Sequence, residues 1–432
     1  GNFGFGYDAL SRRTSLTRPN AVNTSYSYDN LSRLLSVTHA MAGTTLDGAT
    51  YTLDSAGNRT AKSDLYAGVT TNYGYDAIYE LLNATQAGTT TESYTYDPVG
   101  NRLSNLTGSG WSYNTSNELN SRPSMSYTYD ANGDTTSKTD STGTTNYSWD
   151  YDNRLTSANL PGSGGTVTFK YDPFGRRIEK TSSAGTSIYA YDKNNLIEET
   201  NSSGTVVARY AQGLKMDEEL AMLRSGTTSY YEVDGLGTAT SLSNAAGALA
   251  QTYTFDSFGN LTASSGSLTN PFRYTGREWD TETNLQFSRF RYYDPSVGRF
   301  LTEDPLGFKA APNFYPYVDN RPTRYRDPLG LIRDCAQEQI DCFNKCYQGS
   351  LPWPFGCSSN PKVRKWSRYA YCQSKCLALY LECEAENEGK KLIDACAQNP
   401  AACVAIGVGV GIIILQPETG PILGPVIAGA AH

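Results

Sequence analysis

The segment Tyr96-Asp97-Pro98-Val99-Gly100-Asn101-Arg102 is one copy of a motif that recurs along most of this 432-residue chain. With x for any residue, the shared pattern is apolar-x-Tyr-Asp-x-x-Gly-(Asn or Arg)-Arg-apolar. Successive aspartates mostly lie about twenty residues apart, and spacing and residue type recur together, which indicates a repeat protein. Further copies have their aromatic or apolar residue at Tyr7, Tyr28, Leu53, Tyr75, Tyr129, Tyr171, Tyr191 and Phe255.

Each copy has the pattern of a β-hairpin. Alternation such as Tyr94-Thr95-Tyr96 predicts a strand with one aromatic face. Asp-x-x-Gly predicts a turn, because aspartate caps its own backbone and glycine adopts the left-handed conformation. A single hairpin cannot bury its ring face, so neighbouring copies are expected to stack into one curling sheet. The predicted fold class is therefore mainly β, a partial cocoon of hairpins.

Composition agrees with short strands joined by turns. The chain has 40 Gly and 32 Tyr, with 38% hydrophobic and 18% charged residues, which argues against long helices and a polytopic membrane protein. A net charge of −7 gives no electrostatic reason to expect a nucleic-acid partner. Only two histidines are present, His39 and His432, so chemistry built on a His base or several His ligands is nearly excluded. We expect no metal and no cofactor.

A second stretch of the sequence is more specific than the repeats. It comprises the segments RYTGREWD (273–280), RFRYYDPSVGRFL (289–301), DPLG (304–307), NFYPY (313–317) and DPLGL (327–331). Together with the repeats, these motifs resemble the Rhs/YD-repeat family, and most closely the Rhs-associated core of polymorphic toxins and of toxin-complex C components. The resemblance covers residues 1–331, loosely at first and tightly from about Tyr189 onward.

This resemblance implies a spiral β-shell, a hollow cocoon, around a variable C-terminal cargo. We accordingly divide the chain into a YD-repeat shell over residues 1–188, an Rhs-associated core over 189–331, and a variable, Cys-rich C-terminal domain over 332–432. Because the chain opens inside a repeat, we expect it to be the C-terminal part of a longer protein.

Two Asp-Pro-Leu-Gly motifs close the core, beginning at Asp304 and Asp327. In the Rhs family such a pair forms an aspartyl-protease dyad that cuts the chain after the Leu of the second motif, here between Leu331 and Ile332. The resemblance thus implies a single-turnover self-cleavage, and a purely turn-forming role for both aspartates is the alternative. Earlier Asp-Pro-x-Gly copies, at Asp97 and Asp172, continue into Arg and a strand and are read as hairpin turns.

The chemistry of such a dyad requires two carboxyl groups that share a poorly solvated site. Their like charges separate the two pKa values, so that one member stays ionised and activates water while the other is protonated and polarises the scissile carbonyl. Arg291 or Arg299 is expected to bias the pair electrostatically.

Cysteine is confined to the last 101 residues, which hold all nine. Two triplets have spacings of seven and four, then four and seven, which would place each triplet on one face of a helix. An antiparallel α-hairpin would then carry three disulfide rungs, and zinc binding or free thiols are the alternatives. The predicted pairs are Cys335–Cys383, Cys342–Cys376 and Cys346–Cys372, which leaves Cys357, Cys396 and Cys403 unassigned.

The last residues are apolar, over 401–431, and contain an uncharged run of 15 residues, shorter than a usual membrane span. Packing within the cargo or shell and a membrane-inserting hairpin are both compatible with this segment. Dense disulfides would imply an oxidising destination, so we expect the protein to be secreted or at the cell surface.

Two functions follow from the sequence. The first is a toxin shell that releases its C-terminal cargo by self-cleavage, with an immunity protein and a delivery system as expected partners. The second is an exported surface scaffold or adhesin that never cuts itself.

Overall fold

Aspartate side chains organise each repeat turn in the computed structural model, which describes residues 1–307 and 312–331. At the Asp97 turn, Oδ1 accepts hydrogen bonds from the N–H groups of Val99 at 3.0 Å and Asn101 at 2.9 Å, while Oδ2 accepts from Asn101 Nδ2 at 3.0 Å. Gly100 has φ of 80° and donates its N–H to the Asp97 carbonyl at 3.0 Å. The turn predicted for Asp-x-x-Gly is therefore confirmed.

The described residues form three antiparallel sheets, in which every strand pairs with its neighbour in sequence. The first sheet contains β1 (Gly4–Tyr7), β2 (Arg13–Thr17), β3 (Val22–Tyr28), β4 (Leu34–Met41), β5 (Thr44–Leu53), β6 (Arg59–Asp64), β7 (Val69–Tyr75), β8 (Leu81–Gln86), β9 (Thr89–Tyr96), β10 (Arg102–Asn105) and β11 (Gly108–Ser109).

The second and largest sheet continues the same up-and-down order. It contains β12 (Ser112–Tyr113), β13 (Leu119–Arg122), β14 (Met125–Tyr129), β15 (Thr135–Asp140), β16 (Gly143–Trp149), β17 (Leu155–Asn159), β18 (Thr166–Tyr171), β19 (Arg177–Ser182), β20 (Gly185–Asp192), β21 (Asn195–Asn201), β22 (Val206–Gln212), β23 (Glu219–Arg224), β24 (Thr227–Val233), β25 (Ala239–Ser243), β26 (Leu249–Phe255) and β27 (Leu261–Gly266).

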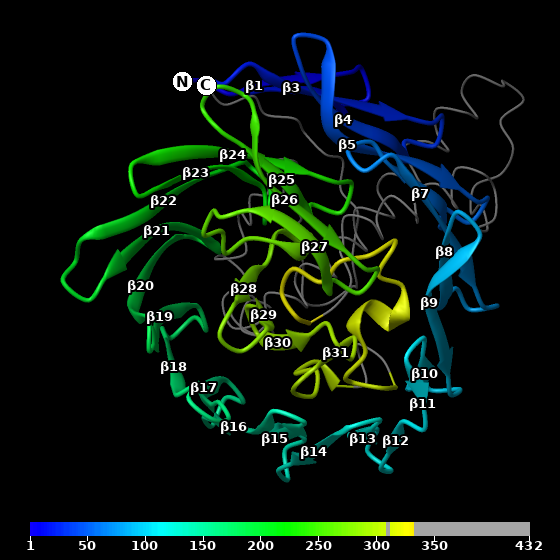
Figure 1. Ribbon diagram of the computed structural model, residues 1–432, viewed down its shortest axis with the longest axis vertical. Coiled ribbons are helices and arrows are strands. Elements are labelled where there is room, and N and C mark those ends of the chain that lie inside the picture. Colours follow the sequence, from blue (N-terminus) through cyan, green and yellow to red (C-terminus); the bar gives the residue numbers. More distant parts are fainter. Residues whose placement is uncertain (308–311, 332–432) are drawn as a thin grey trace, which may run out of the picture. The chain divides into compact units, whose positions relative to one another are not determined.

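The Rhs-like segment contains the third sheet and, among its described residues, two short 3₁₀ turns. They are η1 (Tyr274–Gly276), β28 (Glu278–Asp280), β29 (Leu285–Ser288), β30 (Arg291–Asp294), β31 (Arg299–Phe300) and η3 (Tyr317–Asn320). Figure 1 shows β28–β31 lying inside the curl that the first two sheets trace. We refer to residues 272–307 and 312–331 as the inner core and to residues 1–266 as the shell.

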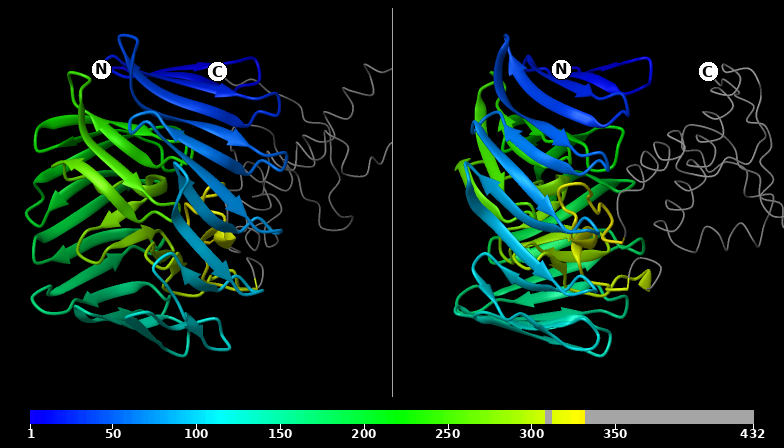
Figure 2. Two further views of the ribbon diagram at one scale, coloured as in Figure 1. Left: turned by 45° about the vertical axis from the view of Figure 1, so that its right-hand side comes forward. Right: turned by 90° about the vertical axis from the view of Figure 1, so that its right-hand side faces the viewer.

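A bulge at the aromatic position helps each repeat to curve. The strand register shifts at this residue in most copies, for example between Gly74 and Tyr75 and between Lys170 and Tyr171. Bulges bend a strand and increase its twist. Repeated at one end of successive hairpins, they are suited to curling the sheet, and both views in Figure 2 show the stacked hairpins with their turns along the rims.

Where a tyrosine precedes the repeat aspartate, its hydroxyl can tie neighbouring repeats together. Tyr96 donates to the carbonyl of Leu81 at 2.9 Å, and Tyr171 donates to the carbonyl of Leu155 at 2.7 Å. The ring is thus packed within the sheet face while its hydroxyl satisfies a backbone acceptor of the preceding hairpin. Phenylalanine could fill the same space but would leave that carbonyl without this donor, which explains the preference for tyrosine.

The two ends of the shell meet through buried polar contacts. Arg18 donates to the carbonyl of Tyr231 at 2.7 Å, and the Tyr51 hydroxyl accepts the N–H of Gly235 at 2.8 Å. His39 Nε2 lies 3.0 Å from the Val233 carbonyl, and burial, with Arg18 adding to it, lowers the pKa of His39 to about 3. The histidine is therefore neutral and structural. These contacts join β2–β5 to β24 and its following turn.

The prediction of a mainly β fold with long antiparallel sheets is confirmed. The predicted α-hairpin with its six paired cysteines, and the apolar segment 401–431, lie outside the described residues. Within residues 1–307 and 312–331, no helix is long and apolar enough to cross a membrane.

Candidate functional site

Both predicted catalytic aspartates are buried in the inner core. Asp304 follows β31 and Asp327 follows η3, and their relative exposures are 7% and 3%. Asp304 opens its turn as the shell aspartates do, with Oδ1 accepting the N–H of Leu306 at 2.9 Å. Asp327 Oδ1 accepts the N–H groups of Gly330 at 2.8 Å and Leu331 at 3.1 Å.

One arginine joins the two carboxyl groups. Arg291, at the start of β30, places Nη2 2.6 Å from Asp304 Oδ2 and 3.5 Å from Asp327 Oδ2. Because both oxygens lie beside the same nitrogen, they are at most about 6 Å apart. The guanidinium itself stacks 3.7 Å from the centre of the Phe300 ring. The structure thus brings Asp304, Asp327 and Arg291 together.

The backbone that precedes the predicted cut is held by the same residues. Arg291 Nε donates to the Gly330 carbonyl, and Nη1 donates to the carbonyl of Phe314 at 2.7 Å. Gly330 has φ of 75°, and a Cβ at this position would lie 2.5 Å from the Ser288 carbonyl oxygen. Only glycine fits there without movement. Leu331 is buried, and Ile332 lies outside the described residues.

Burial dominates the electrostatics of the pair. It raises the pKa of Asp327 to about 6, an effect that Asp304 reinforces and Arg291 opposes. Burial likewise raises the pKa of Asp304, against the lowering effect of Arg291. Desolvation also lowers the pKa of Arg291, with both aspartates opposing the change. One cation thus faces two carboxyl groups, and the site is neutral only when one of them is protonated.

Arg299, the other arginine proposed from the sequence, is bound elsewhere. Its guanidinium donates to Asn101 Oδ1 at 3.0 Å and to the carbonyl of Asn117, both on the shell. Its role is to attach β31 to the shell. Asp294 is likewise occupied, because its Oδ2 binds Lys138 Nζ at 2.9 Å and its Oδ1 accepts the N–H of Ser296.

Sequence reasoning missed a signal that separates the core aspartates from those of the shell. Four residues after most of the shell aspartates stands a side chain that donates to Oδ2 of the aspartate, such as Asn101 or Arg176. Four residues after Asp304 and Asp327 stand Phe308 and Leu331, which have no polar side chain. The second oxygen is therefore left for Arg291.

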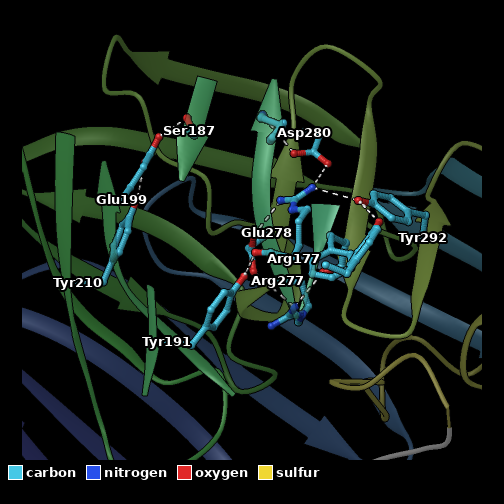
Figure 3. Close-up of polar contacts among 12 residues, drawn as sticks. Arg177, Ser187, Tyr191, Glu199, Tyr210, Arg277, Glu278, Asp280 and Tyr292 are labelled. Carbon is cyan, nitrogen blue, oxygen red and sulfur yellow. Dashed lines mark hydrogen bonds and ion pairs between the residues drawn. The ribbon is translucent and has the colours of Figure 1, made fainter. Parts of the chain in front are cut away.

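A cluster of buried charges that the sequence did not reveal attaches this inner core to the shell (Figure 3). Arg177 of β19 forms ion pairs with Glu278 at 2.8 Å and with Asp280, and it also donates to the Tyr292 hydroxyl at 3.2 Å. Arg277 binds Asp217 and donates to a core carbonyl at 2.9 Å. All these charges are buried, so each needs its partner. This cluster fixes β28 and β30, and β30 carries Arg291.

Within residues 1–307 and 312–331, no group of three His, Cys, Asp or Glu side chains is arranged to hold a metal ion. The cysteines proposed for disulfides, namely Cys335, Cys342, Cys346, Cys372, Cys376 and Cys383, lie outside this range.

A family model of the teneurin YD-shell matches residues 66–323, which is more than half of the chain. The chain belongs to this family. Its YD-shell repeats are those of the Rhs type, and the tRNA3(Ser)-specific nuclease WapA of Bacillus spizizenii is 32% identical over 273 residues, covering 59% of this chain and 12% of WapA. The toxin protein Tse5 of Pseudomonas aeruginosa is 36% identical over 104 residues, covering 24% of this chain and 8% of Tse5.

The YD-shell fold is also that of a solved toxin complex. The crystal structure of TcdB2-TccC3-Cdc42 superposes with a TM-score of 0.63 at 20% identity, covering 79% of this chain and 20% of that chain. At this identity the likeness shows the fold alone. The present YD-shell chain spans only a small part of each of these relatives.

Proposed function

We propose that this chain is the C-terminal part of an Rhs-family polymorphic toxin whose β-shell encloses a C-terminal effector and frees it by cutting between Leu331 and Ile332. The observation that carries the proposal is the pair of buried aspartates on Arg291, with Asp327 also accepting the N–H of Leu331. Relatives that share the YD-shell, WapA and Tse5, are named as a nuclease and a toxin.

In this proposal the two carboxyl groups have different tasks. Asp304 is closer to the Arg291 cation, which favours its ionised form, so it acts as the base that takes a proton from water. Asp327, whose pKa burial raises to about 6, acts as the acid. The water oxygen bonds to the Leu331 carbonyl carbon, the C–N bond breaks, and Asp327 gives its proton to the departing Ile332 amine. The products are a carboxyl group on Leu331 and a free amine on Ile332.

Arg291 positions the reacting groups and takes no part in proton transfer. Its contacts with Gly330 and Phe314 hold the backbone before the cut, and its contacts with both aspartates hold the carboxyl groups beside it. Because the bond to be cut belongs to the same chain, the reaction gains from high effective molarity and needs one turnover only.

Intact mass under denaturing conditions tests this proposal. We expect wild-type protein to yield two fragments that separate after Leu331, and Asp304→Asn and Asp327→Asn to yield one chain of 47.1 kDa. Asp97→Asn and Asp172→Asn are matched controls, since both open Asp-Pro-x-Gly turns in the shell, and they should still be cut. A single wild-type chain of 47.1 kDa would refute self-cleavage and favour an uncut, exported surface scaffold.

The C-terminal domain, residues 332–432, is proposed to be the released effector, stapled by the three predicted disulfides and exported to an oxidising compartment. An immunity protein, a delivery system and a membrane contact through residues 401–431 complete the proposal. Alkylation of the purified protein before and after reduction, read by mass, counts the disulfides. Uptake of label by all nine cysteines before reduction would contradict the stapled hairpin.

A further inference from the structure

The residue four positions after each repeat aspartate is usually a hydrogen-bond donor. Its side chain donates to Oδ2 of the aspartate at distances of 2.6 to 3.0 Å, as Arg33 Nε does to Asp29 and Asn260 Nδ2 does to Asp256. The donors at this position are Arg12, Arg33, Asn58, Asn101, Arg154, Arg176 and Asn260.

Two turns break this rule and place an acid where the donor belongs. Glu80 follows Asp76 by four residues, and Asp134 follows Asp130 by four residues. A third turn shows the difference clearly. There Glu118 stands at the same position, but the first residue is Asn114, whose amide donates to Glu118, so donor and acceptor are merely exchanged. In the Asp76 and Asp130 turns, carboxyl groups occupy both of the positions that the other turns give to an acceptor and a donor.

Both acid–acid turns contact the inner core close to the dyad. Glu80 Oε1 accepts a hydrogen bond from Asn320 Nδ2 at 2.9 Å, and Asn320 also donates to the Gly100 carbonyl at 2.8 Å. Asn320 lies in η3, seven residues before Asp327. The turn therefore holds the segment that leads to the second dyad aspartate.

The turn that contains Asp134 holds the segment that leads to the first dyad aspartate. The next residue, Thr135, donates both its N–H at 2.9 Å and its hydroxyl at 2.7 Å to the Leu301 carbonyl, three residues before Asp304. The preceding residue, Gly133, accepts from the Tyr315 hydroxyl at 2.9 Å. Asp134 itself is fully buried, and neither carboxyl oxygen has a hydrogen-bond partner among the described residues.

The charged groups that act on these acids are negative. Asp134 is influenced by Asp130 of its own turn, Asp150 of the next turn and Glu303 of the inner core. Glu80 is influenced by Asp76 of its own turn and Asp319 of the inner core, beside the neutral amide of Asn320.

The repulsion among these carboxylates can be relieved by a bound metal ion or by a bound proton. The described residues contain no set of acidic ligands arranged for a metal, which leaves the proton. Burial, reinforced by the neighbouring carboxylates, raises the pKa of both Glu80 and Asp134 to about 7, although the hydrogen bond from Asn320 opposes the rise at Glu80.

We propose that Asp76–Glu80 and Asp130–Asp134 are two proton-operated latches that join the shell to the inner core on either side of the dyad. When each turn holds a proton, one carboxyl group becomes the donor that the other repeats obtain from Asn or Arg, and the latch is closed. When the protons leave, buried like charges oppose each other and the hold on Asn320 and Leu301 loosens. This inference does not depend on whether the chain cuts itself.

The sign of the effect follows from the direction of the pKa shift. The folded protein keeps a proton on each raised carboxyl group that the unfolded chain releases near pH 4, so the stabilisation is complete in acid and lost as pH rises toward 7. Across that window each latch makes the folding equilibrium constant fall about tenfold per pH unit. Above the pKa that the group has in the folded protein, the contribution of each latch to folding stability no longer changes with pH.

The test uses the full chain carrying Asp304→Asn, so that self-cleavage plays no part. Urea unfolding between pH 5 and pH 8.5, followed by intrinsic fluorescence, compares this parent with Asp134→Asn and with Glu80→Gln. The first substitution restores the Asp–Asn pairing that Asp97 and Asn101 already use. Between pH 5 and pH 7, the folding equilibrium constant of each variant should fall less steeply than that of the parent, by a factor of about ten per pH unit. Hydrogen exchange of residues 312–331 should also become less sensitive to pH.

Glu118→Gln is the matched control and should leave the pH dependence as it is in the parent. If plots of the folding constant against pH for Asp134→Asn and Glu80→Gln run parallel to that of the parent, the latch proposal is refuted. Stabilisation of the parent by calcium or magnesium chloride that Asp134→Asn abolishes would overturn it as well, in favour of a metal site. Should Asp134→Asn fail to fold, Glu80→Gln and the exchange of the parent at pH 6 and pH 8 still decide the matter.

Discussion

The acid role proposed for Asp327 predicts how self-cleavage depends on pH. Burial raises the pKa of Asp327 to about 6, with Asp304 adding to the shift and Arg291 opposing it. If the protonated form of Asp327 is required, the rate must follow the fraction of molecules that carry this proton. About one tenth carry it at pH 7 and about one hundredth at pH 8, so the rate should fall about tenfold per pH unit above 6.

The acid side of the profile depends on the other carboxyl group. Asp304 must be ionised to accept a proton from water, and burial raises its pKa too, although Arg291 at 2.6 Å opposes this. The rate is therefore expected to fall again in stronger acid, which gives a bell-shaped profile with its maximum below pH 6.

Uncut starting material for this assay is chain that was expressed as insoluble protein and recovered in urea, before it could fold and cut itself. Wild-type chain unfolded in urea is diluted into buffers between pH 4.5 and pH 8.5, and the appearance of the two fragments is timed on denaturing gels. Intrinsic fluorescence follows folding in parallel, and rates are compared where fluorescence recovers before the fragments appear. A cleavage rate that is constant between pH 6 and pH 8, or that rises with pH, would refute the assignment of Asp327 as the acid.

Further substitutions test the supports of the site. Arg291→Lys should leave the protein folded but slow cleavage by at least about a hundredfold, timed on gels, because an ammonium group cannot reach both aspartates and the Gly330 carbonyl together. Gly330→Ala should slow cleavage at least about tenfold, whereas Gly307→Ala, which has φ of 57° but no atom of the described residues within 4 Å of its new Cβ, should cut nearly as wild type. Arg177→Met should lower the free energy of unfolding by about 3–5 kcal/mol, measured by urea denaturation, since it strands the buried carboxylates that Arg177 pairs with.

The sequence was sufficient to predict the repeat and its turn, because both depend on neighbours in the chain. Asp97, Gly100 and Asn101 form their hydrogen bonds within five residues, so the chemistry is visible in the motif itself. The stacking of hairpins followed from the ring face that each copy leaves uncovered. Antiparallel pairing between sequence neighbours then leaves little freedom in topology.

Contacts between distant segments could not be predicted in the same way. The hydroxyl of Tyr96 reaches a carbonyl 15 residues away, and Arg18 reaches Tyr231 across the closure of the shell. Arg177 was indistinguishable from Arg176 in the motif, yet Arg176 binds Asp172 of its own turn and Arg177 binds two acids of the inner core. A one-residue difference in position reverses the face of a strand, and only the folded sheet shows which acids lie opposite.

The candidate site was predicted in part. Resemblance singled out Asp304 and Asp327, and both prove to be buried and close to Arg291. The same reasoning could not separate Arg291 from Arg299, because both flank the same stretch of the inner core. The Arg291 side chain contacts both aspartates, whereas Arg299 binds the shell asparagines.

A single position therefore decides what an aspartate turn of this protein can do. In each of these turns Oδ1 caps backbone N–H groups, and what satisfies Oδ2 differs from turn to turn. A donor four residues later, such as Asn101, uses up that oxygen and leaves a structural turn. An acid at that position, as in Glu80 and Asp134, leaves two carboxyl groups that only a shared proton can reconcile. An apolar residue, as at Leu331, leaves the oxygen to a side chain from another strand, as Arg291 does for Asp327, the aspartate that we propose as the acid of self-cleavage.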